Sequence, residues 1–280
     1  MSNIKKLGMG IVAFDDVTHL KNICSEIRDL VDVILICLQK ESYFGNPIEE
    51  SVVNHIDDLK CEGFIDDIIW FNGVDYGDSI EAPRLTETDK RNTILERLES
   101  YHGCSHCIVT DSDEFYSHDE FANAKKMFNE NEAVASYCRY VNYYRDYQHV
   151  LVWPYDAYVP FITESSYRFD FNKGNFDKPS DPTRRYVLNV GDVYIVIPFS
   201  VMKMHHLSWI RTNIEHKIDN WSSKRYFQNV KGLRERIVER YNNYQNGQNA
   251  IIMFGTPDNE VIVNFLPQQY IHPKYQLTEI

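Results

Sequence analysis

The N-terminal third of the chain alternates short apolar runs with segments of helical periodicity, and this alternation constrains the fold more than any other feature. The runs at 7–14, 32–39 and 64–72 are short and apolar, which predicts buried strands. Segments 18–32 and 48–61 repeat apolar side chains every three or four positions, which predicts helices between those strands. A β-α-β-α-β order is typical of an α/β fold with a mostly parallel sheet flanked by helices.

The pattern changes near residue 116, where the parallel part of the sheet is expected to end. Further along, the sequence predicts a helix at 89–102, a strand at 106–110, a helix at 118–132, antiparallel strands at 135–153, an irregular segment at 155–186, a strand at 190–209 and helices at 210–245. We expect one domain over residues 1–280, with halves at 1–116 and 117–210 and C-terminal helices with a tail at 211–280.

Composition excludes several classes of protein. The 280 residues are 43% hydrophobic, which is enough for a substantial core. A net charge of −12 argues against a protein that binds nucleic acid by broad phosphate neutralisation. No apolar run approaches the roughly 18 residues of a membrane helix, and the N-terminus lacks the apolar core of a signal peptide. These features predict a cytoplasmic protein without a membrane span.

Three acids follow the predicted strand at 106–110 within four positions, in the stretch HCIVTDSDEFY. In open α/β sheets, ligands bind at the carboxyl edge of the strands. Asp111 and Asp113 are two positions apart, so in extended chain their side chains share a face. Two carboxylates on one face suit a hard divalent cation such as Mg²⁺ or Mn²⁺.

The six cysteines lie mostly in apolar or helical patterns, which is typical of reduced core thiols. Cys104 and Cys107 form a Cys-x-x-Cys pair with His102 and His106 nearby. A structural zinc site usually has a second ligand pair at comparable spacing, and the sequence holds no other Cys-x-x-Cys. Zinc binding is therefore the weaker hypothesis for this segment.

Together the predicted elements and three motifs resemble metal-dependent glycosyltransferases of the GT-A fold, over most of residues 5–225. The motifs are Asp111-Ser-Asp113-Glu114, the cluster Lys90-Arg91-Asn92, and His205-His206-Leu-Ser-Trp209-Ile-Arg211. The resemblance implies a Rossmann-type, mostly parallel sheet flanked by helices, with an antiparallel extension on the acceptor side and C-terminal helices. It also implies a transferase that moves a sugar from a nucleotide-diphosphate sugar, UDP-linked by expectation, to an acceptor that the sequence does not identify.

The same resemblance implies roles for individual residues. A divalent cation, Mn²⁺ or Mg²⁺, offsets the charge on the leaving diphosphate, with Asp113 as its direct ligand. Asp111 would orient the ribose or a metal-bound water, and His206 would bind the metal or the diphosphate. The residues expected to contact the nucleotide sugar are Ala13, Phe14, Lys90, Arg91, Asn92, Asp111, Trp209 and Arg211. The second strand ends in Gln39 where many relatives have an acid, which leaves the nucleotide base open.

Two adjacent pairs require a choice between neighbours. Consecutive residues on a helix diverge by about 100 degrees, so at most one of Lys90 and Arg91 is expected to face the site, and Arg91 is favoured for its planar fork. Neighbours on a strand point to opposite faces, so only one of His205 and His206 reaches the site. His206 is favoured because it directly precedes Leu-Ser-Trp.

The acceptor side has little readable pattern. An inverting transfer needs a carboxylate base, for which Asp156, Glu164 and Asp170 are eligible and Glu164 is preferred, because burial near apolar residues would raise its pKa. Two other functions stay open. One is a metal-dependent nucleotidyl or phosphoryl transferase, which would place a third acid near the Asp-x-Asp pair. The other is a non-catalytic sugar-binding module with a transferase-like fold.

Overall fold

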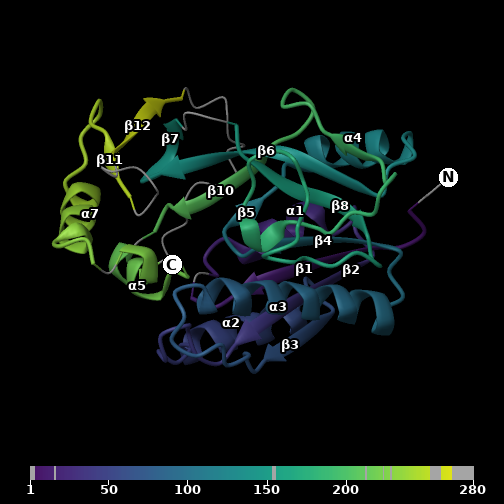
Figure 1. The fold of residues 1–280 in the computed structure, drawn as a ribbon, viewed down its shortest axis with the longest axis horizontal. Coiled ribbons are helices and arrows are strands. Elements are labelled where there is room, and N and C mark those ends of the chain that lie inside the picture. The colour runs from purple at the N-terminus through teal and green to yellow at the C-terminus, as the bar shows by residue number, and fades with distance from the viewer. Residues whose placement is uncertain are drawn as a thin grey trace.

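One continuous sheet organises the molecule. The computed structural model describes residues 4–15, 17–152, 156–211, 213–222, 224–227, 229–252 and 260–266, so the predicted tail beyond 266 lies outside the described residues. Within these residues the strands follow the order β11-β12-β7-β6-β8-β4-β1-β2-β3, and β5, β9 and β10 branch from this path. Figure 1 shows the parallel strands at the lower end and the antiparallel strands at the upper end.

The parallel half has the predicted α/β class. Its strands are β1 (Leu7–Ala13), β2 (Val33–Gln39), β3 (Asp67–Phe71) and β4 (His106–Asp111), and β1 lies between β2 and β4. Its helices are α1 (Leu20–Ile27), α2 (Glu50–Cys61) and α3 (Ala82–Glu96), which continues as one π-helical turn (Arg97–Tyr101). Every residue of β1 and β2 is buried, as expected for strands covered on both faces.

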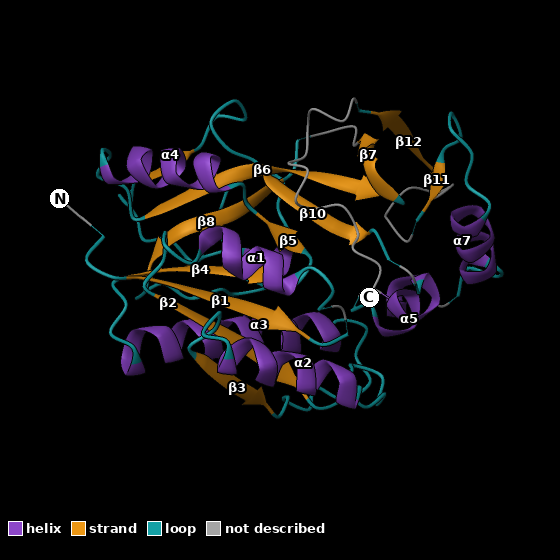
Figure 2. Ribbon diagram, turned by 180° about the vertical axis from the view of Figure 1, so that it is seen from behind, coloured by secondary structure: helices purple, strands orange, loops and turns teal. Residues whose placement is uncertain are grey.

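Helices cover both faces of this half. Side chains of α1, α2 and α4 (His118–Asn129) share one hydrophobic cluster with β1 residues such as Met9. The apolar residues of α3 belong to a second cluster with Val109 on the opposite face. Figure 2, the view from behind, shows α1 and α4 in front of the sheet. The parallel strands are therefore closed from the side and open to ligands only at their ends.

The antiparallel half begins after β4. Its elements are β5 (Glu114–Phe115), β6 (Ala135–Tyr144), β7 (Asp146–Val152), β8 (Tyr158–Glu164), a 3₁₀ turn (Pro182–Arg184), β9 (Tyr194–Val196) and β10 (Met204–Trp209). Strand β10 pairs parallel with β6 and antiparallel with β5, where His206 lies opposite Glu114. This pairing brings the late histidines beside the acids that follow β4.

The C-terminal elements lie at one end of the sheet (Figure 1). They are α5 (Ile214–Asn220), α6 (Lys224–Phe227), α7 (Leu233–Asn242), β11 (Ala250–Ile251) and β12 (Glu260–Phe265). They bury a third apolar cluster together with Tyr144 and Trp209. None of the helices in the described part of the chain combines the length and apolar character that a bilayer crossing requires.

Three predicted elements differ from the structure. The helix expected from residue 89 begins at Ala82, because Pro83 occupies the first turn, where a proline is tolerated. The segment predicted to be irregular contains β8, which includes Pro160. The strand expected at 190–209 is two strands, β9 and β10, separated by a turn in which the Val201 amide donates to the Pro198 carbonyl at 2.9 Å.

Candidate active site

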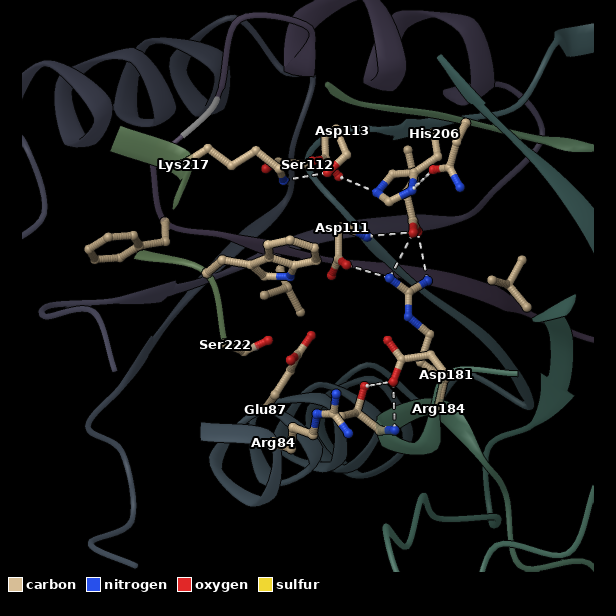
Figure 3. Close-up of a pocket in the computed structure, with 18 of the residues that line it drawn as sticks. Arg84, Glu87, Asp111, Ser112, Asp113, Asp181, Arg184, His206, Lys217 and Ser222 are labelled. Atoms are coloured by element: carbon tan, nitrogen blue, oxygen red, sulfur yellow. Dashed lines mark hydrogen bonds and ion pairs between the residues drawn. The ribbon is translucent and has the colours of Figure 1, made fainter. Parts of the chain in front are cut away.

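A cleft with a volume of about 960 Å³ lies where the carboxyl ends of the parallel strands meet the antiparallel half. Its walls come from the ends of β1, β2 and β4, from α3, and from β6 and β10 (Figure 3). Both acidic and basic side chains line this cleft. The acids are Asp15, Glu87, Asp111, Asp113, Glu114 and Asp181, and the basic residues are Arg84, Lys90, Arg184, Arg185, His206, Arg211 and Lys217.

Asp111, the last residue of β4, is held by two buried arginines. The Arg91 guanidinium lies 2.9 Å from Asp111 Oδ1, and Arg184 donates to Asp111 Oδ2. Burial alone would raise the pKa of Asp111, but the two guanidinium groups lower it below its usual range. The role of Asp111 toward a metal stays a prediction, and in this geometry its charge is balanced by protein cations.

Asp113 lies two residues further along the same turn and meets different partners. Arg211 donates to Asp113 Oδ2 at 3.0 Å, and His206 Nε2 lies 3.4 Å from Asp113 Oδ1. Burial would raise the pKa of Asp113, but His206, Lys217 and Arg211 hold it well below its usual range. Asp113 is 6% exposed, so it is a buried carboxylate of the cleft wall.

The pair formed by Asp113 and His206 fits a divalent cation. His206 Nδ1 lies 2.6 Å from Asn142 Oδ1, and this contact places the ring proton on Nδ1. The Nε2 lone pair then faces a carboxylate oxygen, and two facing acceptors require a proton or a cation between them. Metal-binding histidines commonly have such a second hydrogen bond. Two protein ligands leave coordination positions for phosphate oxygens and water, and among the described residues no group of three His, Cys, Asp or Glu side chains is placed around a metal position.

Lys217 adds a positive charge to the same wall. It extends from α5, donates to Ser208 Oγ and lies over the rings of Trp209 and Trp221, at 5.7 and 5.4 Å from their centroids. Trp209 is 4% exposed and packs edge-on against Trp221 at 5.9 Å. The indole of Trp209 therefore holds the Lys217 ammonium in the cleft wall, and its expected contact with the nucleotide sugar stays a prediction.

Of Lys90 and Arg91, only Lys90 is among the residues that line the cleft, whereas Arg91, which the sequence favoured, is fully buried behind Asp111. Lys90 lines the cleft and donates to Tyr43 Oη at 3.2 Å, while Arg91 donates to Glu87 at 2.6 Å and to Asp111. Both side chains are buried, and Lys90 lies over the ring of Tyr43 in the loop after β2. Burial lowers the pKa of Lys90.

Two other predicted contacts point away from the cleft. Asn92 exchanges two hydrogen bonds of 2.9 Å with the backbone of Phe169, so it anchors a neighbouring loop. Ala13 is buried in the core between β1 and the helices, whereas the next residue, Phe14, lines the cleft. The end of β1 shows the alternation, since Val12 also lines the cleft and adjacent side chains of a strand point to opposite faces.

Glu164 is too far from the acids to serve as the base. It pairs with His106, at the start of β4, whereas Asp111 ends that strand. Five residue steps separate these ends by roughly 16 Å. Burial does raise the pKa of Glu164, as expected. The other two candidates, Asp156 and Asp170, are engaged elsewhere, by Arg139 and by two backbone amides.

Sequence reasoning missed several residues of the cleft. The clearest cases are Glu87, Asp181 and Arg184. Glu87 precedes the predicted start of its helix, and the 3₁₀ turn with its N-cap residue Asp181 lies in a segment without periodicity. Asp181 Oδ1 caps this turn by accepting from the amide and hydroxyl of Thr183 at 2.8 and 2.9 Å. Figure 3 shows its second oxygen turned toward the interior of the cleft.

The cysteine pair lies in the core, on the face of the sheet that α3 covers. Cys104 and Cys107 are buried there, and burial raises the pKa of both thiols, that of Cys104 to about 11. Metal binding requires thiolates, so this environment favours the reduced core role.

The chain is similar to solved structures, whereas no protein-family model and no curated protein matches it. Among solved structures, S. aureus TarS 1–349 is similar at 8% identity and a TM-score of 0.42, with 81% of this chain and 74% of that one covered. GalNAc-T7, solved with UDP, GalNAc and Mn²⁺, has 10% identity, a TM-score of 0.43 and coverage of 84% and 52%.

A longer TarS structure is similar at 8% identity and a TM-score of 0.31, over 49% of this chain and only 22% of that one. TarS and GalNAc-T7 are glycosyltransferases. All three TM-scores lie below 0.5, so the functional proposal depends on the residues of the cleft.

Proposed function

We propose that the protein is a metal-dependent glycosyltransferase of the GT-A type, which moves a sugar from a nucleotide diphosphate to an acceptor. The observation that carries this proposal is the facing pair of Asp113 and His206, 3.4 Å apart, beside the cations of Arg211 and Lys217. A divalent cation, Mn²⁺ or Mg²⁺, held by this pair would stabilise the charge that develops on the leaving diphosphate. Lys217 and Arg211 add fixed positive charge at the same place.

The nucleotide would bind at the ends of β1 and β2. Phe14 offers an apolar surface there, and Gln39 presents an amide that lies at the cleft and is 8% exposed. An amide donates and accepts at once, so it matches the imide edge of uracil, which has one N–H between two carbonyl groups. This complementarity supports UDP as the nucleotide.

Asp181 is the proposed base for an inverting transfer. Its Oδ1 is engaged in capping the 3₁₀ turn, while its Oδ2 is turned to the cleft interior, on the side formed by the antiparallel half (Figure 3). A carboxylate there can accept the proton of an acceptor hydroxyl. Asp181 replaces Glu164 in this role because Glu164 lies at the other end of β4.

A two-metal nucleotidyl or phosphoryl transferase fits the cleft less well. That chemistry needs several carboxylates available to two cations. Asp111 and Glu114, the other two acids of the turn, are instead paired with Arg91 and Arg184. The cleft therefore favours one cation bound by Asp113 and His206.

The test is calorimetric binding of UDP, CDP and GDP with Mn²⁺ and with chelator, followed by release of UDP from a panel of UDP-sugars. UDP should bind only with the metal, and Asp113→Asn should reduce that binding by at least about tenfold. Asp119→Asn, whose carboxylate is 95% exposed, is the matched control and should bind normally. Binding of free sugars alone, unaffected by Mn²⁺, would instead support a sugar-binding module.

The base is tested by a second pair of variants. Asp181→Asn should reduce turnover by about 10²- to 10⁴-fold while UDP binding persists. Glu164→Gln, the matched control, should remain active. The reverse pattern would remove Asp181 from the mechanism.

A further inference from the structure

Arg184 joins the acceptor side of the cleft to its donor side. It lies at the end of the 3₁₀ turn and donates through Nη1 and Nη2 to both oxygens of Glu114, at 2.8 and 2.7 Å. The same Nη2 also donates to Asp111. One guanidinium group thus binds two carboxylates of the turn that carries the Asp-x-Asp motif.

Glu114 is a rigid partner for this contact. Its Oε2 accepts from Thr110 Oγ1 at 2.7 Å and from the Asp111 amide at 3.1 Å, so it is fixed to the end of β4. The side chains of Glu114 and Arg184 are 2% and 5% exposed. Buried, forked ion pairs have defined geometry, and a lysine cannot reproduce the planar fork.

The contact also fixes Asp181. The Arg184 amide donates to the Asp181 carbonyl at 3.0 Å, and Asp181 caps the turn through Thr183. The Asp181 carboxylate therefore sits one short turn from a guanidinium group that is itself held by Asp111 and Glu114. Any shift of Arg184 relative to β4 moves Asp181 relative to the donor carboxylates.

From this juxtaposition we infer that Arg184 is a positioning residue, which sets the distance between the base Asp181 and the donor carboxylates. The inference rests on the proposed function, since it gives Asp181 the role of base. Arg184 acts through Asp181 and Asp111, and no contact of Arg184 with the reacting atoms is required. A misplacement of about 1 Å at a reacting group can reduce a rate by about 10²-fold.

The test is a double-mutant cycle of Arg184→Lys and Asp181→Asn, measured as UDP release from the UDP-sugar that the wild type hydrolyses. Arg184→Lys should reduce kcat by about 10²-fold and leave the Kd for UDP with Mn²⁺ within about threefold. In the Asp181→Asn background, Arg184→Lys should reduce kcat by less than about threefold, because the base that Arg184 positions is already absent. Arg168→Lys, on an arginine that is 38% exposed, is the control.

Hydrogen exchange supplies a readout that does not depend on activity. In Arg184→Lys, amides of residues 179–186 should exchange faster, while those of β4 keep their protection. If that variant does not fold, Glu114→Gln removes the same fork from the other side and should give the same pattern.

Unchanged exchange at 179–186, or rate losses that multiply in the cycle, would overturn the positioning role alone. A wild type that neither binds UDP nor releases it from any donor would overturn the proposed function, and the positioning role with it.

Discussion

The adjacent histidines of β10 provide a sharp test, because their surroundings predict opposite losses. His205 is 3% exposed, stacks on Phe115 with ring centroids 4.7 Å apart and shares a hydrogen bond of 2.8 Å with Tyr143 Oη. His206 is 24% exposed at the side chain and faces Asp113 across the cleft. One residue should therefore contribute to stability and the other to metal binding.

The magnitudes follow from these contacts. His205→Ala removes an aromatic contact worth about 0.5–1.5 kcal/mol and takes a hydrogen-bond partner from a buried hydroxyl, at about 1–3 kcal/mol. The free energy of unfolding should fall by about 1.5–4.5 kcal/mol, with Mn²⁺-dependent UDP binding retained. His206→Ala should cost less than about 1 kcal/mol of stability, as expected for a partly exposed side chain, and should weaken Mn²⁺-dependent binding by about 10- to 100-fold.

Urea denaturation and calorimetry with and without Mn²⁺ measure the two quantities on both variants. The reasoning is refuted if folded His205→Ala protein loses its response to Mn²⁺. It is equally refuted if His206→Ala binds UDP and Mn²⁺ as the wild type does.

Four further substitutions have defined outcomes. Arg91→Ala should lower the free energy of unfolding by about 3–5 kcal/mol, because it leaves Glu87 without its cation and Asp111 with Arg184 alone. Lys90→Ala should mainly weaken UDP binding, by about tenfold in calorimetry. Burial lowers the pKa of His106 from 6.5 to about 4. The unfolded chain therefore binds more protons than the folded chain between pH 4 and 6.5. The free energy of unfolding should fall by up to about 3 kcal/mol as the pH drops from 6.5 to 4. Denaturation series at several pH values should show that His106→Gln removes this contribution. Gly10→Ala should lower the melting temperature, because its Cβ would lie 2.0 Å from Ile94 Cγ2, and an unchanged value would refute that packing.

The parallel half was predictable because each strand has a local signature. Apolar runs bounded by polar residues predicted β1, β2, β3 and β4, and the acids after β4 were expected at a ligand-binding edge. Strand β8 was missed because Pro160 indicates a loop. The structure tolerates it because β4 pairs with β8 only at Thr163 and Glu164, so Pro160 faces no residue of β4.

The site was predictable only where a motif had a short spacing. Asp111, Asp113 and His206 line the same cleft, and the roles that the resemblance implies for them stay predictions. Arg184 carries no local signal, because its contacts with Glu114 and Asp111 span 70 and 73 positions. The position of Glu164 relative to the acids could not be predicted from the sequence either. It depends on the register of β8 against β4, which places Glu164 beside His106.

Strand β10 has a consequence for how the chain acquires its site. It pairs with β5 and β6. This pairing places His206 and Arg211 beside acids that precede them in the sequence by about a hundred residues, and the Arg211–Asp113 contact spans 98 positions. The order of synthesis therefore separates folding of the parallel layer from completion of the cleft, because β5 has no partner strand until β10 leaves the ribosome. Pairings of such high sequence separation form slowly. A nascent chain ending before residue 204 should hold the Asp-x-Asp turn with an open strand edge, which exposes it to chaperones or to aggregation until the last third of the protein arrives.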